Sequence, residues 1–306
     1  MKIFKRTRII SILLTMMLIT LIASPVTVSA ETKVNLGTTL ETYAVLAYST
    51  VTSTGATTIG GDVGGNVGLS AGTSVTGFPP ATISNGSIHL SDTSAMLAQD
   101  ELTTAYNDAA GRTVTANLTG QDLGGMTLTT GVYKFDSSAQ LTGTLTLDAQ
   151  GDPDAAFIFQ IGSTLTTASA SSINLINGAR FCRVFWQVTS SATIGTTSNF
   201  VGHIFAMVSI TVNTGARVQG QLLARTGAVT LDSNEITNGF CADTAQTTAV
   251  TTTAVTTSDT TTTPSGTLDI PDTGETSEPG NFIIIGLLLL GLAVSLAYVR
   301  RRQINH

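Results

Sequence analysis

The sequence predicts an all-β solenoid, in which short strands wind into stacked coils. The chain is rich in threonine, valine and glycine, and only 11% of its residues are charged and 6% aromatic. That composition favours short strands separated by tight turns. One pattern also recurs: an apolar residue, a threonine and a second apolar residue precede a polar residue. Two copies are Ile210-Thr211-Val212-Asn213 and Val229-Thr230-Leu231-Asp232.

The threonine of this pattern returns at nearly constant intervals. Steps of 19, 18, 29, 18 and 19 residues separate Thr127, Thr146, Thr164, Thr193, Thr211 and Thr230. A period near 20 residues without a helix in each repeat is typical of a β-solenoid, because one coil cannot bury its apolar residues alone. We expect the apolar neighbours of each threonine to face the interior and the threonines to face outward. An antiparallel β-sandwich is the alternative.

One segment, residues 91–112, follows a helical period instead. Asp92 is suited to cap the start of this helix, and Gly111 is suited to end it. We expect one amphipathic helix that lies along the solenoid and covers an apolar face. The apolar residues on one side of it are Ala98, Leu102, Ala105 and Ala109.

The N-terminus, residues 1–30, has the order of a secretory signal peptide. Four basic residues precede an apolar run from Ile9 to Ile22, and small residues follow at 28–30. This order predicts cleavage after Ala30. The apolar run is short for a membrane span, so we expect the mature chain to be secreted.

The C-terminus combines a linker with an anchor. Residues 244–269 form a threonine-rich tract that has little to bury and predicts an extended linker. Residues 270–306 contain the sequence IPDTG, an apolar run at 282–299 and three arginines. That run can just span a bilayer, with the arginines on the cytoplasmic side.

Residues 270–306 resemble a sortase cell-wall sorting signal, with Ile270 where that family usually has leucine. The resemblance implies that sortase cleaves between Thr273 and Gly274 and joins Thr273 to peptidoglycan on a Gram-positive-type surface. The chain would then contact the membrane only through its C-terminal segment, before sorting. The alternative is a single-pass membrane protein that faces outward.

The net charge of the mature chain indicates which partners it can bind. Removing both ends leaves 7 basic and 18 acidic residues, a net charge of −11 without a basic patch. We therefore do not expect the mature chain to bind nucleic acid.

The only cysteines are Cys182 and Cys241. In an exported protein such a pair usually forms a disulfide, and two free thiols are the alternative.

Several long motifs in order resemble the bacterial and fungal ice-binding family known as DUF3494. They include LDAQGDPDAAFIFQIGSTLTTAS, CRVFWQV and ITVNTGARVQGQLLARTGAVTLD, and the resemblance covers about residues 33–241. It implies a domain, residues 31–243, folded as a right-handed β-helix of triangular cross-section, with its coils in discontinuous order and one long α-helix packed alongside. It also implies a disulfide between Cys182 and Cys241.

Members of that family bind ice through a flat face that carries a loose T-A/G-x-T/N motif. This chain has related sequences three residues after its repeated threonines, with departures at Tyr133, Ala170 and Arg217. Threonine suits such a face because its χ1 angle is stiff, so its hydroxyl and methyl groups are held in place. The resemblance gives these candidate ice-binding residues: Thr130, Thr167, Ser169, Thr196, Ser198, Asn199, Thr214 and Ala216.

The sequence contains no convincing catalytic constellation. Asp148, Asp152 and Asp154 could hold Ca²⁺ but serve equally well as a corner between coils. His89 and His203 stand apart from each other and from acidic residues at motif spacing. We therefore expect no enzyme activity, no cofactor and no bound metal.

These observations predict a cell-surface ice-binding protein of modest activity, which either adheres to ice or inhibits its recrystallisation. Its partners would be the ice crystal surface, sortase and peptidoglycan. The alternative is a wall-anchored adhesin that uses the same solenoid to bind a glycan or a protein.

Overall fold

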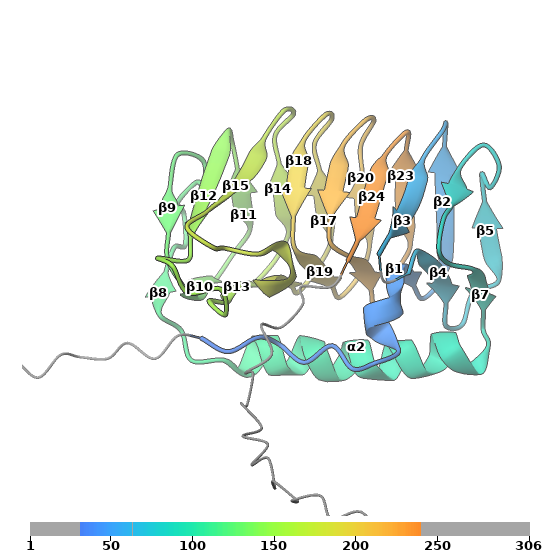
Figure 1. Ribbon diagram of the computed structural model, residues 1–306, viewed down its shortest axis with the longest axis horizontal. Coiled ribbons are helices and arrows are strands. Elements are labelled where there is room, and N and C mark those ends of the chain that lie inside the picture. Colours follow the sequence, from blue (N-terminus) through green and yellow to red (C-terminus); the bar gives the residue numbers. More distant parts are fainter. Residues whose placement is uncertain (1–30, 63, 240–306) are drawn as a thin grey trace, which may run out of the picture. The chain divides into compact units, whose positions relative to one another are not determined.

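The computed structural model describes residues 31–62 and 64–239. They lie in the first of two compact units, Met1–Thr247. The expected signal peptide, the linker, the sorting signal and Cys241 lie outside the described residues. The described chain forms three parallel sheets, A, B and C, with one long helix beside them (Figure 1). The predicted β-solenoid is confirmed, and the β-sandwich alternative is excluded because the strand pairs are parallel.

The central strands of sheet A are buried on both faces, while the edge strands β7 and β8 are more exposed. The strand β16 is typical of the centre, since all five of its residues are buried. In spatial order the sheet consists of β7 (Ile88–Leu90), β4 (Asn66–Leu69), β1 (Tyr43–Ala47), β22 (Leu222–Ala224), β19 (His203–Ala206), β16 (Val184–Val188), β13 (Phe157–Ile161), β10 (Gly131–Phe135) and β8 (Ala116–Asn117).

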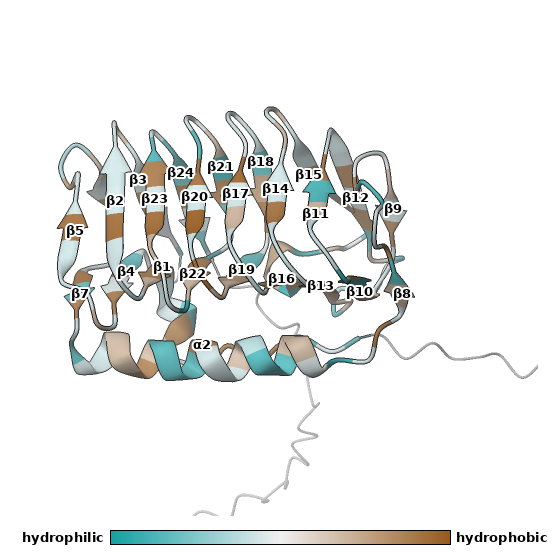
Figure 2. Cartoon of the chain, turned by 180° about the vertical axis from the view of Figure 1, so that it is seen from behind, coloured by the Kyte–Doolittle hydropathy of each residue, from teal (hydrophilic) through white to brown (hydrophobic). Residues whose placement is uncertain are grey.

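Sheet B alternates buried apolar residues with outward polar ones, as the repeat predicts. Figure 2 shows its strands side by side, from β5 to β11. In spatial order they are β11 (Ala139–Leu141), β14 (Leu165–Thr167), β17 (Ala192–Ile194), β20 (Ile210–Val212), β23 (Val229–Asp232), β2 (Thr50–Thr54) and β5 (Ser74–Thr76).

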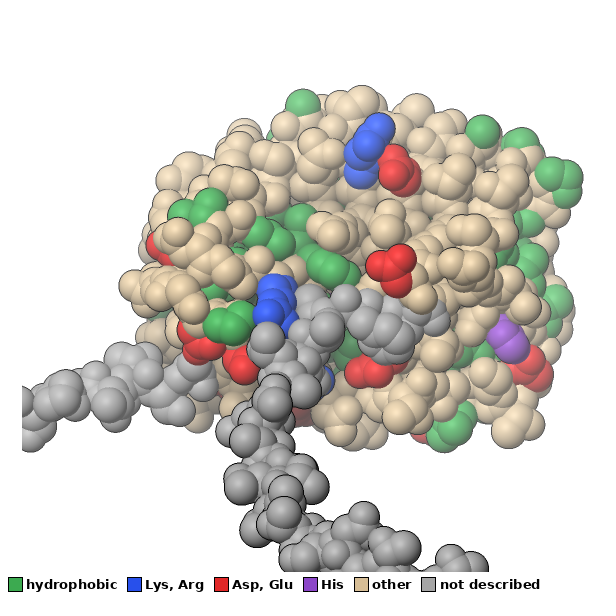
Figure 3. All heavy atoms as spheres, viewed as in Figure 1, with side chains coloured by type: hydrophobic (Ala, Val, Ile, Leu, Met, Phe, Trp, Pro, Cys, Tyr) green, Lys and Arg blue, Asp and Glu red, His purple; other side chains and the backbone are tan. Residues whose placement is uncertain are grey.

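Sheet C closes the triangle and carries mixed polar, charged and apolar residues (Figure 3). Its strands in spatial order are β6 (Thr82–Ile83), β3 (Thr58–Gly61), β24 (Glu235–Asn238), β21 (Arg217–Gln219), β18 (Asn199–Val201), β15 (Ser172–Ile176), β12 (Thr144–Asp148) and β9 (Thr127–Leu128). Two 3-10 helices, η1 (Leu40–Thr42) and η2 (Phe181–Arg183), precede β1 and β16.

The coils are stacked out of chain order. In each sheet a strand from the N-terminal part pairs with one from the C-terminal part: β1 with β22, β2 with β23, and β3 with β24. The first coil therefore completes the solenoid beside the last one. This is the discontinuous order that the family resemblance implies.

The helix α2 (Thr93–Gly111) covers sheet A, as expected. Its cap is also confirmed, since the Asp92 carboxylate accepts a hydrogen bond of 2.8 Å from the N–H of Ala95. The predicted apolar face packs on outward side chains of sheet A such as Ile158 and Phe185. At the other end of the helix, the Gln160 side-chain amide donates to the carbonyl oxygens of Ala109 and Arg112, at 2.9 Å each. Because α2 covers sheet A, the exposed faces of the solenoid are those of sheets B and C.

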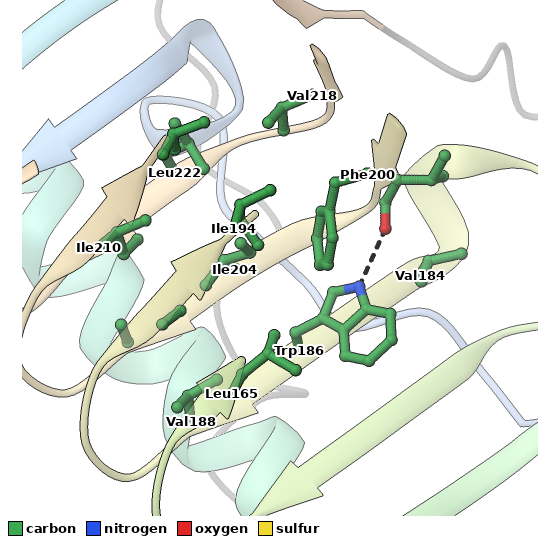
Figure 4. Close-up of a cluster of buried hydrophobic side chains, with 14 of the residues drawn as sticks. Leu165, Val184, Trp186, Val188, Ile194, Phe200, Ile204, Ile210, Val218 and Leu222 are labelled. Carbon is green, nitrogen blue, oxygen red and sulfur yellow. Dashed lines mark hydrogen bonds between the residues drawn. The ribbon is translucent and has the colours of Figure 1, made fainter. Parts of the chain in front are cut away.

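The interior of the solenoid is a continuous apolar core, in which Trp186 lies beside Phe200 (Figure 4). The Trp186 ring lies 3.9 Å from the Phe159 ring, at an interplanar angle of 8°, and 5.2 Å from that of Phe200. The Trp186 indole N–H donates to the carbonyl oxygen of Val201 at 2.9 Å. Trp186 is therefore a core residue, as its apolar strand suggests.

His203 should make folding stability pH-dependent. It is 2% exposed and lies against the ring of Phe185, and burial lowers its pKa from 6.5 to about 4. The folded protein therefore favours the neutral imidazole of His203. The stability that this preference contributes is fully present above pH 6.5, where the unfolded chain also has a neutral imidazole. Stability should fall by about 3 kcal/mol between pH 6.5 and 4. Urea unfolding at several pH values checks this, and the His203→Gln variant should lose that part of the slope. An equal slope in both proteins would contradict the prediction.

Candidate functional site

Sheet B carries an unbroken line of threonines along the solenoid axis. Each threonine is paired in register with the next one across successive strands. All six are at least partly exposed, and Gln140 continues the line beyond Thr166. The line, called the threonine row below, consists of Thr166, Thr193, Thr211, Thr230, Thr52 and Thr76.

A second line of small residues runs beside the threonine row. Residues two positions earlier point to the same side of a strand, and here they are mostly serine and threonine. Neighbouring hydroxyls in this line also interact, since Thr164 donates to Ser138 at 2.9 Å. The line consists of Ser138, Thr164, Ser191, Ser209, Ala228, Thr50 and Ser74. The surface thus combines short hydroxyl and methyl groups without bulky side chains.

The surface of sheet B is also nearly free of charge. Its strands contain one ionisable residue, Asp232, which lies at the border with sheet C. The Asp232 carboxylate accepts a hydrogen bond from the hydroxyl of Thr214 on the neighbouring coil. By contrast, sheet C carries the ion pair between Arg217 and Glu235, 3.1 Å apart. Of the two exposed faces, only sheet B presents a uniform and uncharged array.

This geometry suits a solid with a regular lattice. Rungs in a sheet repeat about every 4.8 Å, and alternate residues along a strand lie about 6.6 Å apart. The threonine row and its neighbouring line therefore form a two-dimensional grid of hydroxyl and methyl groups. Stiff β-branched side chains on paired strands lose little entropy on binding. Many weak contacts with ordered water can then add up.

Two residues of the predicted threonine series lie on another face, and a third lies beside the row. Thr127 and Thr146 pair with each other in sheet C, so their place in the series was wrong. Thr164 belongs to the line beside the row, and Thr166 is the residue that pairs with Thr193. The 18-residue step from Thr146 to Thr164 hides the change of face, because the coil that starts at Thr146 is longer and returns to sheet C only at Asn174, 28 residues further on.

Four of the predicted ice-binding residues do not reach the surface of sheet B. Thr167, Ser198 and Ala216 are buried, at 3%, 1% and 0% exposure. Each points into the corner between sheets B and C, where the Thr167 hydroxyl accepts a hydrogen bond from the N–H of Gly195. Thr130 precedes sheet A, and its hydroxyl donates to the carbonyl oxygen of Ala156 at 2.9 Å. These four residues therefore do not contribute to the exposed surface of sheet B.

The other four predicted residues cluster along the same corner. Ser169, Thr196 and Thr214 end the sheet B side of three successive coils. Asn199 begins sheet C, where it pairs with Ser172. The predicted motif therefore marks the corner rather than the flat face.

The corner also has a characteristic backbone conformation. Thr197 and Gly215, the second residues of their motifs, have positive φ angles of 54° and 71°, and Ala170 takes the equivalent place in its coil at 57°. Glycine tolerates this left-handed conformation best, whereas a β-branched residue such as Thr197 rarely adopts it. A glycine at the second position, as at Gly215, therefore fits the shape of the turn.

The departures from the motif do not disturb sheet B. Tyr133 lies in sheet A, where it is 5% exposed, and Arg217 lies in sheet C. Neither side chain can therefore interrupt the flat surface of sheet B. Thr52 and Thr76 were missed by sequence reasoning, because the chain reaches sheet B at these positions before the regular repeat begins.

Asp148, Asp152 and Asp154, which by sequence could hold Ca²⁺, lie at the turn that follows β12. Asp148 accepts hydrogen bonds from the N–H of Gln150 and the side chain of Asn177, and Asp154 pairs with Arg183 at 2.7 Å. Within the described residues, no group of three or more potential ligands could hold a metal ion.

The described residues contain no free cysteine. Because Cys241 lies outside the described residues, its disulfide with Cys182 stays a prediction.

Family models match two parts of the chain. The ice-binding-like family matches residues 45–237, and the LPXTG cell wall anchor motif matches residues 269–306. An ice-binding protein of Nostoc sp. (strain HG1) is 53% identical over 201 residues, which cover 65% of this chain and 72% of that protein.

Two solved structures share the fold. An ice-binding protein from an Antarctic biological consortium aligns with a TM-score of 0.65 and 46% identity, over 70% of this chain and 94% of that one. The ice-binding protein of the Antarctic ascomycete Antarctomyces psychrotrophicus aligns with a TM-score of 0.65 and 42% identity, over 69% and 100%. The solenoid, its covering helix and these matches together show that the chain belongs to the ice-binding-like family.

Proposed function

We propose that this chain is a cell-surface protein that binds ice through sheet B. The observation that carries the proposal is the threonine row, which repeats one stiff hydroxyl-bearing side chain on six successive rungs of a face whose strands contain a single ionisable residue. Relatives named as ice-binding proteins support it. A face of this kind limits the growth of the crystal plane to which it adsorbs, or holds a cell against it.

We further propose that the ice-binding domain is exported and attached to the cell wall. The match to the cell wall anchor motif supports sortase cleavage between Thr273 and Gly274 and attachment of Thr273 to peptidoglycan. None of the helices in the described residues is long and apolar enough to span a membrane. The expected span at 282–299 lies outside those residues.

The same evidence supports a binding role rather than catalysis. The family to which the chain belongs is described by ice binding, as are the relatives reported above. A wall-anchored adhesin that binds a glycan or a protein is the alternative. The departures from the motif at Tyr133 and Arg217 lie off sheet B, so they do not count against ice binding there.

Partitioning into ice tests the proposed function directly. The purified full chain, frozen slowly at micromolar concentration, should be enriched in the ice fraction and should inhibit recrystallisation. Bovine albumin in the same solution serves as the control for passive trapping. A folded chain that stays in the liquid with the albumin would refute ice binding.

A further inference from the structure

The threonine row crosses a junction between distant parts of the chain. Thr211 and Thr230 belong to consecutive coils, but the next threonine in space is Thr52, from the other end of the domain. No covalent continuity keeps β2 in register with β23 at this point. The register must come from the contacts between the two strands and their corners.

The coil at this junction is one residue short. Six residues lead from the row threonine to its equivalent position in sheet C in the coils of Thr166, Thr193, Thr211 and Thr52, but only five in the coil of Thr230. The sheet C positions, which pair in register, are Ser172, Asn199, Arg217, Thr58 and Glu235 respectively. The missing residue falls at the corner between sheets B and C.

The side chain of Asn234 fills the gap that this missing residue leaves. Asn234 is 2% exposed. Its side-chain N–H group donates to the carbonyl oxygens of Asn213, at 2.8 Å, and Ala216, at 3.3 Å. Its side-chain oxygen accepts from the N–H of Asp232 at 2.7 Å. Buried main-chain groups need such partners, and this carboxamide supplies the donor and the acceptor of the absent peptide group.

The backbone of Asn234 connects the short coil to the far side of the junction. Its N–H donates to the hydroxyl oxygen of Thr57 at 3.2 Å, and its carbonyl oxygen accepts from the N–H of Thr58 at 2.8 Å. The hydroxyl of Ser53 donates to the same Thr57 oxygen at 2.8 Å. One residue therefore contacts the preceding coil through its side chain and the first coil of the domain through its backbone.

We propose that Asn234 is the positioning residue that keeps the threonine row continuous across this junction. It lets the short coil turn the corner without shifting Thr230, so that Thr52 and Thr76 extend the line begun by the C-terminal coils. This inference rests on the proposed function, in which the row contacts ice. Adsorption to a lattice depends on the number of side chains in register, so a break here shortens the working row.

The Asn234→Ala variant tests the inference against a matched control. Gln221→Ala also removes a fully buried amide, whose nitrogen donates to the carbonyl oxygens of Leu40 and Tyr43 at 2.8 and 2.6 Å, across the same junction but on the side of sheet A. For Asn234→Ala, the concentration needed to inhibit recrystallisation should rise about tenfold, equivalent to about 1.4 kcal/mol. Gln221→Ala should stay near the wild-type value despite a similar fall in Tm.

A rescue variant separates positioning from general stability. One glycine inserted after Ser233 in the Asn234→Ala background restores the six-residue coil, and should restore ice inhibition. If Asn234→Ala alone does not fold, the insertion should also recover folding. Wild-type inhibition by Asn234→Ala, equal losses in Asn234→Ala and Gln221→Ala, or failure of the insertion would each overturn the inference.

Hydrogen exchange keeps this result independent of the proposed function. The amides of β23 and β2 should exchange faster in Asn234→Ala but not in Gln221→Ala, and unchanged exchange would overturn the positioning role. If wild type fails to enter ice, the proposed function is refuted, while the exchange result still decides whether Asn234 sets the register.

Discussion

Replacing Thr193 and Thr211 together by tyrosine should abolish partitioning into ice. The two threonines are paired on adjacent rungs in the middle of the row. Two large rings there would hold the rest of the face away from a flat crystal surface, so that few of the remaining threonines could contact it. Both side chains point outward from sheet B, and surface changes of this kind usually alter stability by less than about 0.5 kcal/mol. The protein should therefore stay folded while ice activity is lost.

The matching control places two tyrosines on sheet C. Thr146 and Asn174 are also paired outward on adjacent rungs, and neither belongs to the threonine row. Thr146→Tyr with Asn174→Tyr should leave partitioning unchanged. Ice partitioning and thermal melting of both double variants make the comparison. Equal loss of activity in both would contradict the assignment of sheet B, and full activity of the Thr193 and Thr211 variant would do so as well.

The repeat pattern predicted the fold better than it predicted the face. Alternation around Thr211 and Thr230, together with a period near 20, is sufficient for a solenoid, since any coil of this length must bury its apolar residues. The period cannot assign a threonine to a side of the triangle, however. Thr127 and Thr211 share the same local sequence pattern but lie on sheets C and B, because corner lengths differ between coils.

Two features of the surface depend on contacts that local sequence does not reveal. Thr52 joins the row only because β2 pairs with β23, more than 170 residues further along the chain. Asn234 matters only because its coil is one residue shorter than its neighbours.

Replacing Trp186 by alanine should lower the free energy of unfolding by about 3 to 5 kcal/mol, the usual range for removing a large aromatic side chain from a core. Trp186 is 0% exposed and stacks between neighbouring coils on Phe159. The change would leave a cavity at that stack and an unpaired carbonyl oxygen on Val201. Urea unfolding followed by circular dichroism measures the loss without relying on the chain's single tryptophan.

Trp186→Phe separates the two contributions. Phenylalanine keeps a ring against Phe159 but cannot donate to Val201, so the loss should be smaller than for alanine. A loss below about 1 kcal/mol for Trp186→Ala would mean that neighbouring side chains collapse into the space. Trp186 is a buried residue of sheet A and does not contribute to the surface of sheet B. Either variant that remains folded at 0 °C should therefore still enter ice. Stability of the core and activity of the face are then separable properties of the same solenoid.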